Sequence, residues 1–121
     1  MIEIKWIETI SNVKDGVRYT RDEYEVGKYI VHDYVRANIE NGTTFRSITI
    51  SEADVNAHYE RRSYLPEIYY NDDFFGSKDC RFEIQTTSYG SLRADEFKKF
   101  MEAQQHAFEV AEALTAKFIN K

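Results

Sequence analysis

The sequence has few of the cysteines that form disulfides in small secreted proteins, and few of the prolines and glycines that form linkers between domains. Its 121 residues include one cysteine, one proline and five glycines. The single cysteine excludes an internal disulfide and suits a reducing compartment, so we expect a cytoplasmic protein. No proline-rich, glycine-rich or low-complexity stretch resembles a linker, so we expect residues 1–121 to form a single α+β domain.

Long hydrophobic runs and an excess of positive charge are also missing. The early alternation of Ile2, Glu3, Ile4 and Lys5 predicts neither a secretory leader nor a membrane span. There are 16 Lys and Arg against 21 Asp and Glu, a net charge of −5. Nucleic-acid binding depends on cations that neutralise phosphates, so we do not expect direct binding. The excess carboxylates suit a partner protein with a basic groove instead.

Residues that carry chemistry do not form a recognisable motif. His32, His58 and His106 lie far apart and lack the spacing of zinc ligands. Cys80 has no base near it in the sequence to generate a thiolate, and Arg61 and Arg62, the centre of the one basic concentration, are typical of a solvated helix end. Phosphate-binding glycine loops and nucleophile elbows are absent from the sequence. We therefore expect no enzymatic activity, cofactor or metal.

Two-residue alternation predicts strands in the first forty residues. Residues 2–10 read as a strand with Ile2, Ile4 and Trp6 on a buried face that can extend to Ile10. The turn-forming residues 12–16 then lead into a second strand at residues 17–26. The secondary structure of residues 20–40 can be predicted as either strand or helix, because residues 20–23 match a helix capping box. We favour a strand, since its apolar residues scatter around a helical wheel but share one side of a strand: Tyr29, Val31, Val35, Ala37 and Ile39.

Asn41-Gly42 predicts a two-residue type I′ turn between this strand and the next, at residues 43–50. Such a turn places Val35 opposite Ile48 and Ala37 opposite Arg46. Further along, residues 51–62 predict a short helix that begins at Ser51, residues 68–70 a brief strand, and residues 80–89 the last strand.

The last quarter of the chain, residues 91–119, predicts one long amphipathic helix. Ser91 suits the N-cap, and His106 falls on the polar side. The expected fold is therefore α+β: a mostly antiparallel sheet of about five to six strands, with one short middle helix and one long C-terminal helix packed on a sheet face. The apolar side of that helix comprises Phe97, Phe100, Met101, Gln104, Ala107, Phe108, Ala111, Leu114, Thr115, Phe118 and Ile119.

Without a catalytic motif, the function we expect is a small acidic protein-interaction module. Its sharpest form is an accessory or inhibitor protein of a phage or mobile element that occupies the basic groove of a nucleic-acid enzyme, as an anti-CRISPR protein does. The region that suits a partner best mixes aromatic and acidic side chains, which supply contact area and electrostatic steering. The predicted partner-binding residues are Tyr64, Glu67, Tyr69, Tyr70, Asp72, Asp73, Phe74 and Phe75.

Two other functions stay open. One is a small-ligand enzyme or binding protein with a pocket between the sheet and the C-terminal helix, where Gln104 and Thr115 put polar groups on the apolar side. The other is a structural subunit that self-associates through an uncovered edge strand or apolar face, which makes a homo-oligomer a further expectation.

Overall fold

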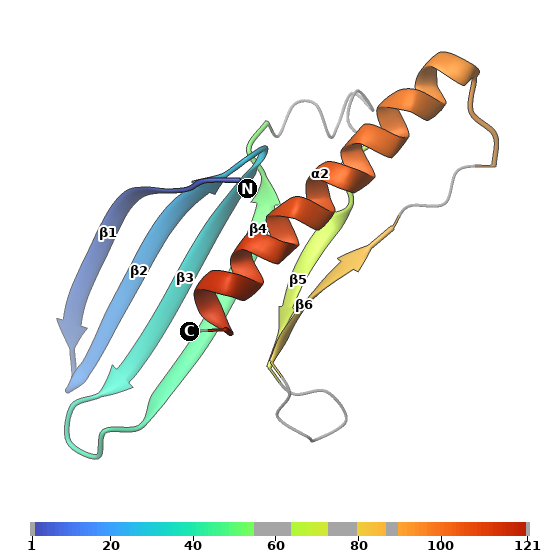
Figure 1. Ribbon diagram of the computed structural model, residues 1–121. Coiled ribbons are helices and arrows are strands. Elements are labelled where there is room, and N and C mark those ends of the chain that lie inside the picture. The colour runs from blue at the N-terminus through green and yellow to red at the C-terminus, as the bar shows by residue number, and fades with distance from the viewer. Residues whose placement is uncertain (1, 55–63, 73–79, 87–89, 121) are drawn as a thin grey trace.

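The computed structural model describes residues 2–54, 64–72, 80–86 and 90–120. Within these residues, six strands form two antiparallel sheets, and one long helix crosses them (Figure 1). The four-stranded sheet has the order β1-β2-β3-β4, and β5 pairs with β6. This arrangement confirms the predicted α+β antiparallel class. The elements are β1 (Ile4–Lys14), β2 (Val17–Val26), β3 (Tyr29–Asn38), β4 (Thr44–Glu52), β5 (Glu67–Asn71), β6 (Arg81–Gln85) and α2 (Ala94–Phe118).

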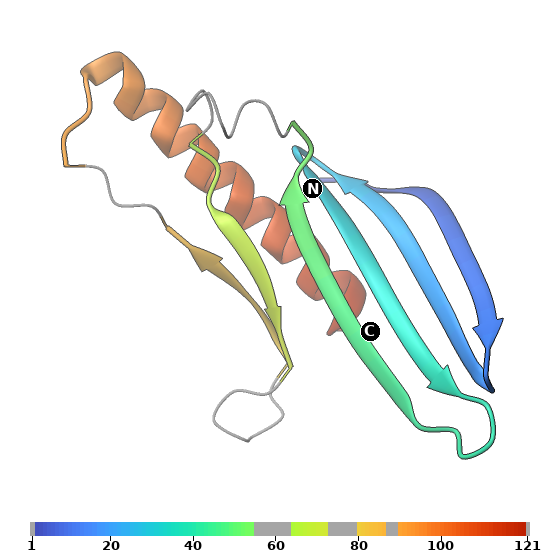
Figure 2. The same cartoon turned by 180° about the vertical axis from the view of Figure 1, so that it is seen from behind.

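The core lies between α2 and one side of the strands, called here the helix side. Figure 2 shows the opposite side of β1–β4, the outer side, which no other described element covers. The second half of α2 has small alanine side chains on its packing face, so the helix can approach the sheet closely. A fully buried side chain such as Leu114 contributes about 1.5–3 kcal/mol. The core comprises Val26, Tyr29, Val31, Ile48, Ile68, Ala107, Val110 and Leu114.

A buried ion pair lies beside the C-terminal end of α2. The Asp33 residue is only 5% exposed. Arg46 on the neighbouring strand donates to both of its carboxylate oxygens, at 2.9 Å from Nε and 2.7 Å from Nη2. The Arg46 guanidinium also lies 5.2 Å from the centre of the Phe118 ring. This two-pronged contact supplies the partners that a buried carboxylate requires.

His106 joins α2 to the turn between β2 and β3, although we predicted it on the solvent side. Its Nε2 accepts a hydrogen bond of 2.9 Å from the backbone N–H of Lys28, and its ring stacks on Tyr29 at 6.1 Å between centres. Gly27 has a φ of 57°, and a Cβ there would lie 2.4 Å from the imidazole, so the site requires glycine. Burial, followed by the charge of Lys28, lowers the pKa of His106.

The hairpin turns differ from those we predicted. Asp15 and Gly16 have φ values of 53° and 76°, as a type I′ turn requires, and β1 continues to Lys14. Asn41 has no positive φ, so the predicted type I′ turn at Asn41-Gly42 is wrong. The backbone carbonyl of Asn38 accepts from the Gly42 N–H at 2.9 Å. The loop is thus longer than two residues.

The register of β3 on β4 is therefore two residues from the predicted one. Val35 lies opposite Arg46 rather than Ile48, and Ala37 lies opposite Thr44 rather than Arg46. A shift of two residues leaves every side chain on its predicted side of the sheet. The choice of strands over a helix for residues 20–40 is confirmed by β2 and β3, which are joined at Gly27 and Lys28.

The short middle helix was predicted to begin at Ser51, and this start is wrong because β4 continues through Glu52. The rest of that predicted helix falls within residues 55–63, outside the described part of the chain. α2 is the one helix in the described part. The last two predicted strands are confirmed as β5 and β6, although β6 ends at Gln85 rather than at the predicted residue 89.

The long helix is confirmed, but its start and its buried face differ from the prediction. Its N-cap is Arg93, which makes no side-chain cap, so Ser91 does not start the helix. Val110 and Ala113 are buried, although neither was assigned to the packing face. The predicted members Phe97, Met101 and Phe108 are each more than half exposed, at 54%, 52% and 51%. The first turns of α2 extend past the strands in Figure 1, so the apolar side chains there lack a sheet to cover.

The predicted buried face of the first strand is confirmed at Ile2 and Ile4, which pack against the core, and is wrong at Trp6 and Ile10, which are exposed. The irregular pairing between Trp6 and Glu8 places Ile10 on the outer side. Ile4 is half-buried, whereas the remaining ten residues of this strand are exposed. Strands lie about 4.8 Å apart, so β1 is about 14 Å from β4, whereas a helix is about 10 Å across. One helix packed over β3 and β4 therefore leaves most of the outermost strand uncovered.

Candidate interaction surface

The predicted partner-binding stretch does not form one surface. Asp73, Phe74 and Phe75 lie outside the described residues. Alternation along β5 directs Tyr70 to the helix side, where its ring centre lies 5.2 Å from that of Phe82. Burial, with a hydrogen bond to Cys80, raises the pKa of Tyr70 to about 12.

Tyr64 is also tied to the fold. Its hydroxyl donates to Glu96 at 3.1 Å, and its carbonyl accepts from the Gln104 amide at 3.1 Å. It therefore holds the segment before β5 against α2. Of the predicted residues, Glu67 and Tyr69 are exposed on the outer side of β5, where the tyrosine hydroxyl donates to the carboxylate. Asp72, just beyond β5, is exposed as well.

The most extensive exposed apolar surface of a single strand belongs to β1. Trp6, Ile10 and Val13 are 58%, 48% and 54% exposed. In the described part of the chain, β1 pairs with β2 along one edge, and no strand lies along the other (Figure 1). An open edge of this kind offers unpaired N–H and C=O groups to an added strand. We define the β1 edge as residues 4–14 with their free backbone groups.

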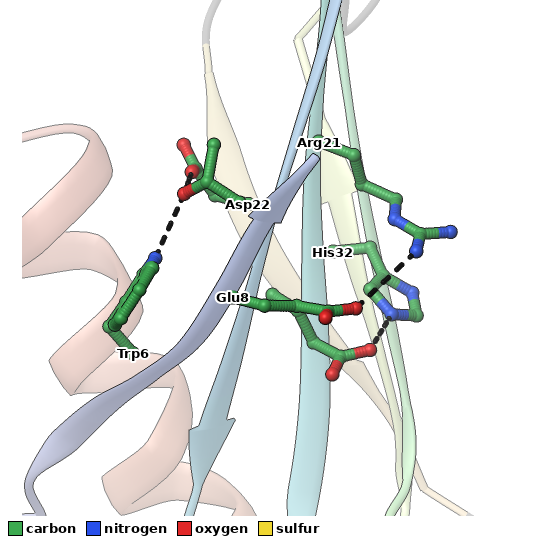
Figure 3. A network of polar contacts seen from close by, with 7 residues as sticks. Trp6, Glu8, Arg21, Asp22 and His32 are labelled. Atoms are coloured by element: carbon green, nitrogen blue, oxygen red, sulfur yellow. Dashed lines mark hydrogen bonds and ion pairs between the residues drawn. The ribbon is translucent and has the colours of Figure 1, made fainter. Parts of the chain in front are cut away.

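On the helix side of the β1 edge, a chain of hydrogen bonds holds Trp6 in place. The indole Nε1 donates to the Thr9 hydroxyl at 2.9 Å, and that hydroxyl donates to Asp22 on β2 (Figure 3). The ring thus keeps one orientation while most of its surface faces solvent. A large aromatic held this way contributes contact area at a low entropic cost.

On the outer side, polar and charged side chains cross the sheet in a row. Glu8 lies 3.8 Å from Arg21, and His32 lies 2.6 Å from Glu23 (Figure 3). The Arg21 Nε is buried without a hydrogen-bond partner. Tyr19 and Tyr34 pack beside this row, 6.3 Å between ring centres. The outer side therefore presents a row of polar side chains next to the β1 edge.

A shallow hollow lies between α2 and β6. It has a volume of about 450 Å³ and is lined mainly by apolar side chains, among them Phe82, Ile84 and Phe108. Thr115 also lines it, but its hydroxyl donates to the Ala111 carbonyl at 2.8 Å. Gln104 is not part of the hollow, because its amide contacts Tyr64. Of the two polar residues predicted to line a pocket, only Thr115 lines the hollow, and its hydroxyl is already hydrogen-bonded.

Among the described residues, no three His, Cys, Asp or Glu side chains come together as a set of cation ligands. The His32–Glu23 pair lines neither the hollow beside α2 nor a smaller one near Phe45. The described part of the chain also contains no helix with the length and apolar character needed to span a membrane.

Comparison of the chain with protein-family models, curated proteins and solved structures finds no match. The candidate surface therefore rests on geometry and chemistry alone. The sequence analysis did not predict the β1 edge, because alternating apolar and polar residues were taken to mean that the apolar side is buried. The number of predicted strands could have indicated an exposed strand, since a single helix about 10 Å wide leaves the outer strands of such a sheet uncovered.

Proposed function

We propose that the protein is a small interaction module that binds another protein through the β1 edge and is not an enzyme. One observation carries the proposal: an eleven-residue strand, exposed along nearly its whole length, has large apolar side chains beside a free edge. Isolated apolar residues on a surface are ordinary, but exposed apolar side chains on both sides of one unpaired strand mark a docking or aggregation site.

Strand addition explains how such a surface binds a partner. Backbone hydrogen bonds to the free edge supply affinity, and alternate side chains on the two sides supply specificity. Trp6 and Val13 project on the helix side, as do their partners Tyr24 and Arg18 on β2, whereas Ile10 projects on the outer side. A bound segment therefore contacts apolar side chains on both sides of the strand.

The test compares two exposed apolar positions in capture experiments from the native host. Val13 on β1 and Phe97 on α2 are each 54% exposed. Mass spectrometry should show that partners captured by the wild type are kept by F97K and lost with V13K. Equal capture by V13K and the wild type would contradict the assignment to β1.

The inhibitor form of this function rests on a different surface. Exposed Glu67, Tyr69 and Asp72 near β5, together with the net charge of −5, support a partner with a basic groove. If that form holds, duplex DNA should compete with a captured nucleic-acid enzyme, and E67K should weaken its capture. Capture that DNA leaves unchanged would argue against groove occupation.

The hollow beside α2 favours the small-ligand function as a second candidate. Its size and apolar lining suit a small apolar molecule. Screening small apolar compounds by NMR should then shift signals of Phe108 and Ala111 and leave those of Val13 unchanged. A screen that shifts none of the lining residues would dismiss this candidate.

A further inference from the structure

The turn after β1 determines which backbone groups face the open edge. Lys14 and Val17 close the two-residue turn and so exchange hydrogen bonds across the hairpin. Because these bonds alternate along an antiparallel pair, Ile10 and Asn12 also direct their N–H and C=O groups to β2. Thr9, Ser11 and Val13 therefore direct theirs outward.

This alternation restricts how a second β1 strand can pair antiparallel with the first. Residues that face each other must both direct their backbone groups outward, or both inward. A two-fold axis at Ser11 satisfies this rule over the whole segment from residue 8 to residue 14. It places Thr9 opposite Val13, Ile10 opposite Asn12, and Glu8 opposite Lys14.

The same register brings opposite charges together. Glu8 faces Lys14 of the other strand, and the two-fold axis repeats the pair at the other end of the segment. Opposite charges directly across an antiparallel pair stabilise it, whereas like charges destabilise it. The Glu8 side chain is 52% exposed beside Arg21, so it is accessible to a second cation.

Neighbouring registers fit less well. An axis at Ile10 shortens the ladder, because Val13 then meets Ile7, where the β1–β2 pairing is irregular between Trp6 and Glu8. An axis at Asn12 moves Lys14 away from Glu8 and opposite Ile10. The Ser11 register is the one that leaves the bulge outside the ladder and pairs both charged ends.

We propose, on the basis of the proposed interaction function, that the partner of the β1 edge is a second copy of this chain, paired antiparallel about Ser11. The pairing joins two four-stranded sheets into one of eight strands and forms about six new backbone hydrogen bonds. The interface is isologous, because both copies contribute the same β1 edge. Pairing covers both of these edges, so the assembly is a closed dimer.

A charge exchange tests both the dimer and its register by sedimentation equilibrium. E8K and K14E each place like charges opposite one another, and each should raise the dissociation constant of the homodimer about tenfold. A mixture of the two variants restores both opposite-charge pairs and should form heterodimers with wild-type affinity. E102K and K98E make the same charge changes on exposed residues of α2 and should leave the homodimer intact.

S11P tests the backbone contribution. The Ser11 N–H faces outward, so proline there removes edge hydrogen bonds without removing a bond to β2, as proline on edge strands generally does. The variant should be monomeric with an unchanged circular dichroism spectrum. A wild-type protein that stays monomeric at all concentrations, or a mixture of E8K and K14E that forms no heterodimer, would overturn the self-pairing. Selective loss of a captured partner with V13K would still support the proposed function in that case.

Discussion

The outermost strand β1 and the central strand β3 are alike in sequence pattern and opposite in environment. β1 has 11 residues and β3 has 10, and each places apolar side chains on the helix side, at Trp6 and Val13 of β1 and at Tyr29 and Val31 of β3. Tyr29 and Val31 on β3 are at most 1% exposed, whereas Trp6 on β1 is 58% exposed. The helix lies over β3 and does not extend over β1. Alternation therefore indicates a strand with one apolar side, and the neighbours of the strand decide whether that side is a core or a binding surface.

The largest difference between the two regions should appear on truncating their apolar side chains. L114A leaves a cavity against β3 and should lower the free energy of unfolding by about 2–5 kcal/mol. V13A removes exposed surface and should change it by less than about 0.5 kcal/mol. Urea denaturation at a concentration that keeps the protein monomeric measures both values. Similar losses in the two variants would remove the distinction between core and edge.

Removing a charged side chain from the core or from the exposed side should give a smaller difference in the free energy of unfolding. R46A leaves the buried Asp33 carboxylate without its two donors and should cost about 2 kcal/mol. R21A removes the 3.8 Å contact to Glu8 on the exposed side and should cost less than about 1 kcal/mol. Thermal or urea unfolding of the two variants provides the comparison. A larger loss in R21A would place the important charge pair at the edge instead of in the core.

The smallest effect is a pH dependence centred on His106. Burial favours its neutral form, so its pKa is lower in the folded than in the unfolded chain. The resulting stability is fully present above the unfolded value of 6.5 and declines as the pH falls towards the folded pKa, because the unfolded chain then binds a proton more readily. H106Q should lose this part of the pH dependence in urea titrations. An unchanged slope would mean that His106 does not contribute.

Local signals predicted much of the fold. Gly27 ends β2 at the expected residue, and the alternation from Tyr29 onward identified β3 against a competing capping box. The rest depends on neighbours that are distant in sequence. Asn41-Gly42 is a strong hairpin signal, yet the side chain of Asn38 accepts from the backbone N–H of Glu40 and Asn41, at 3.0 and 3.2 Å, within a longer loop.

The candidate surface was harder to predict than the fold. An amphipathic pattern shows which residues of α2 are apolar, but the end of the sheet decides that Phe97 stays exposed while Val110 is buried. The aromatic and acidic stretch near β5 was chosen for composition, and composition does not reveal that Tyr64 and Tyr70 pack inward. The edge position of β1 follows from strand order, which periodicity does not encode.

Residue-resolved hydrogen exchange at increasing protein concentration tests the role of the β1 edge most directly. The Ile10, Asn12 and Lys14 amides bond to β2 and should be protected at every concentration, which makes them an internal control. The Thr9, Ser11 and Val13 amides should exchange rapidly in dilute protein and become protected as copies pair. Rapid exchange of these three amides at all concentrations would contradict the pairing of β1 with a second copy.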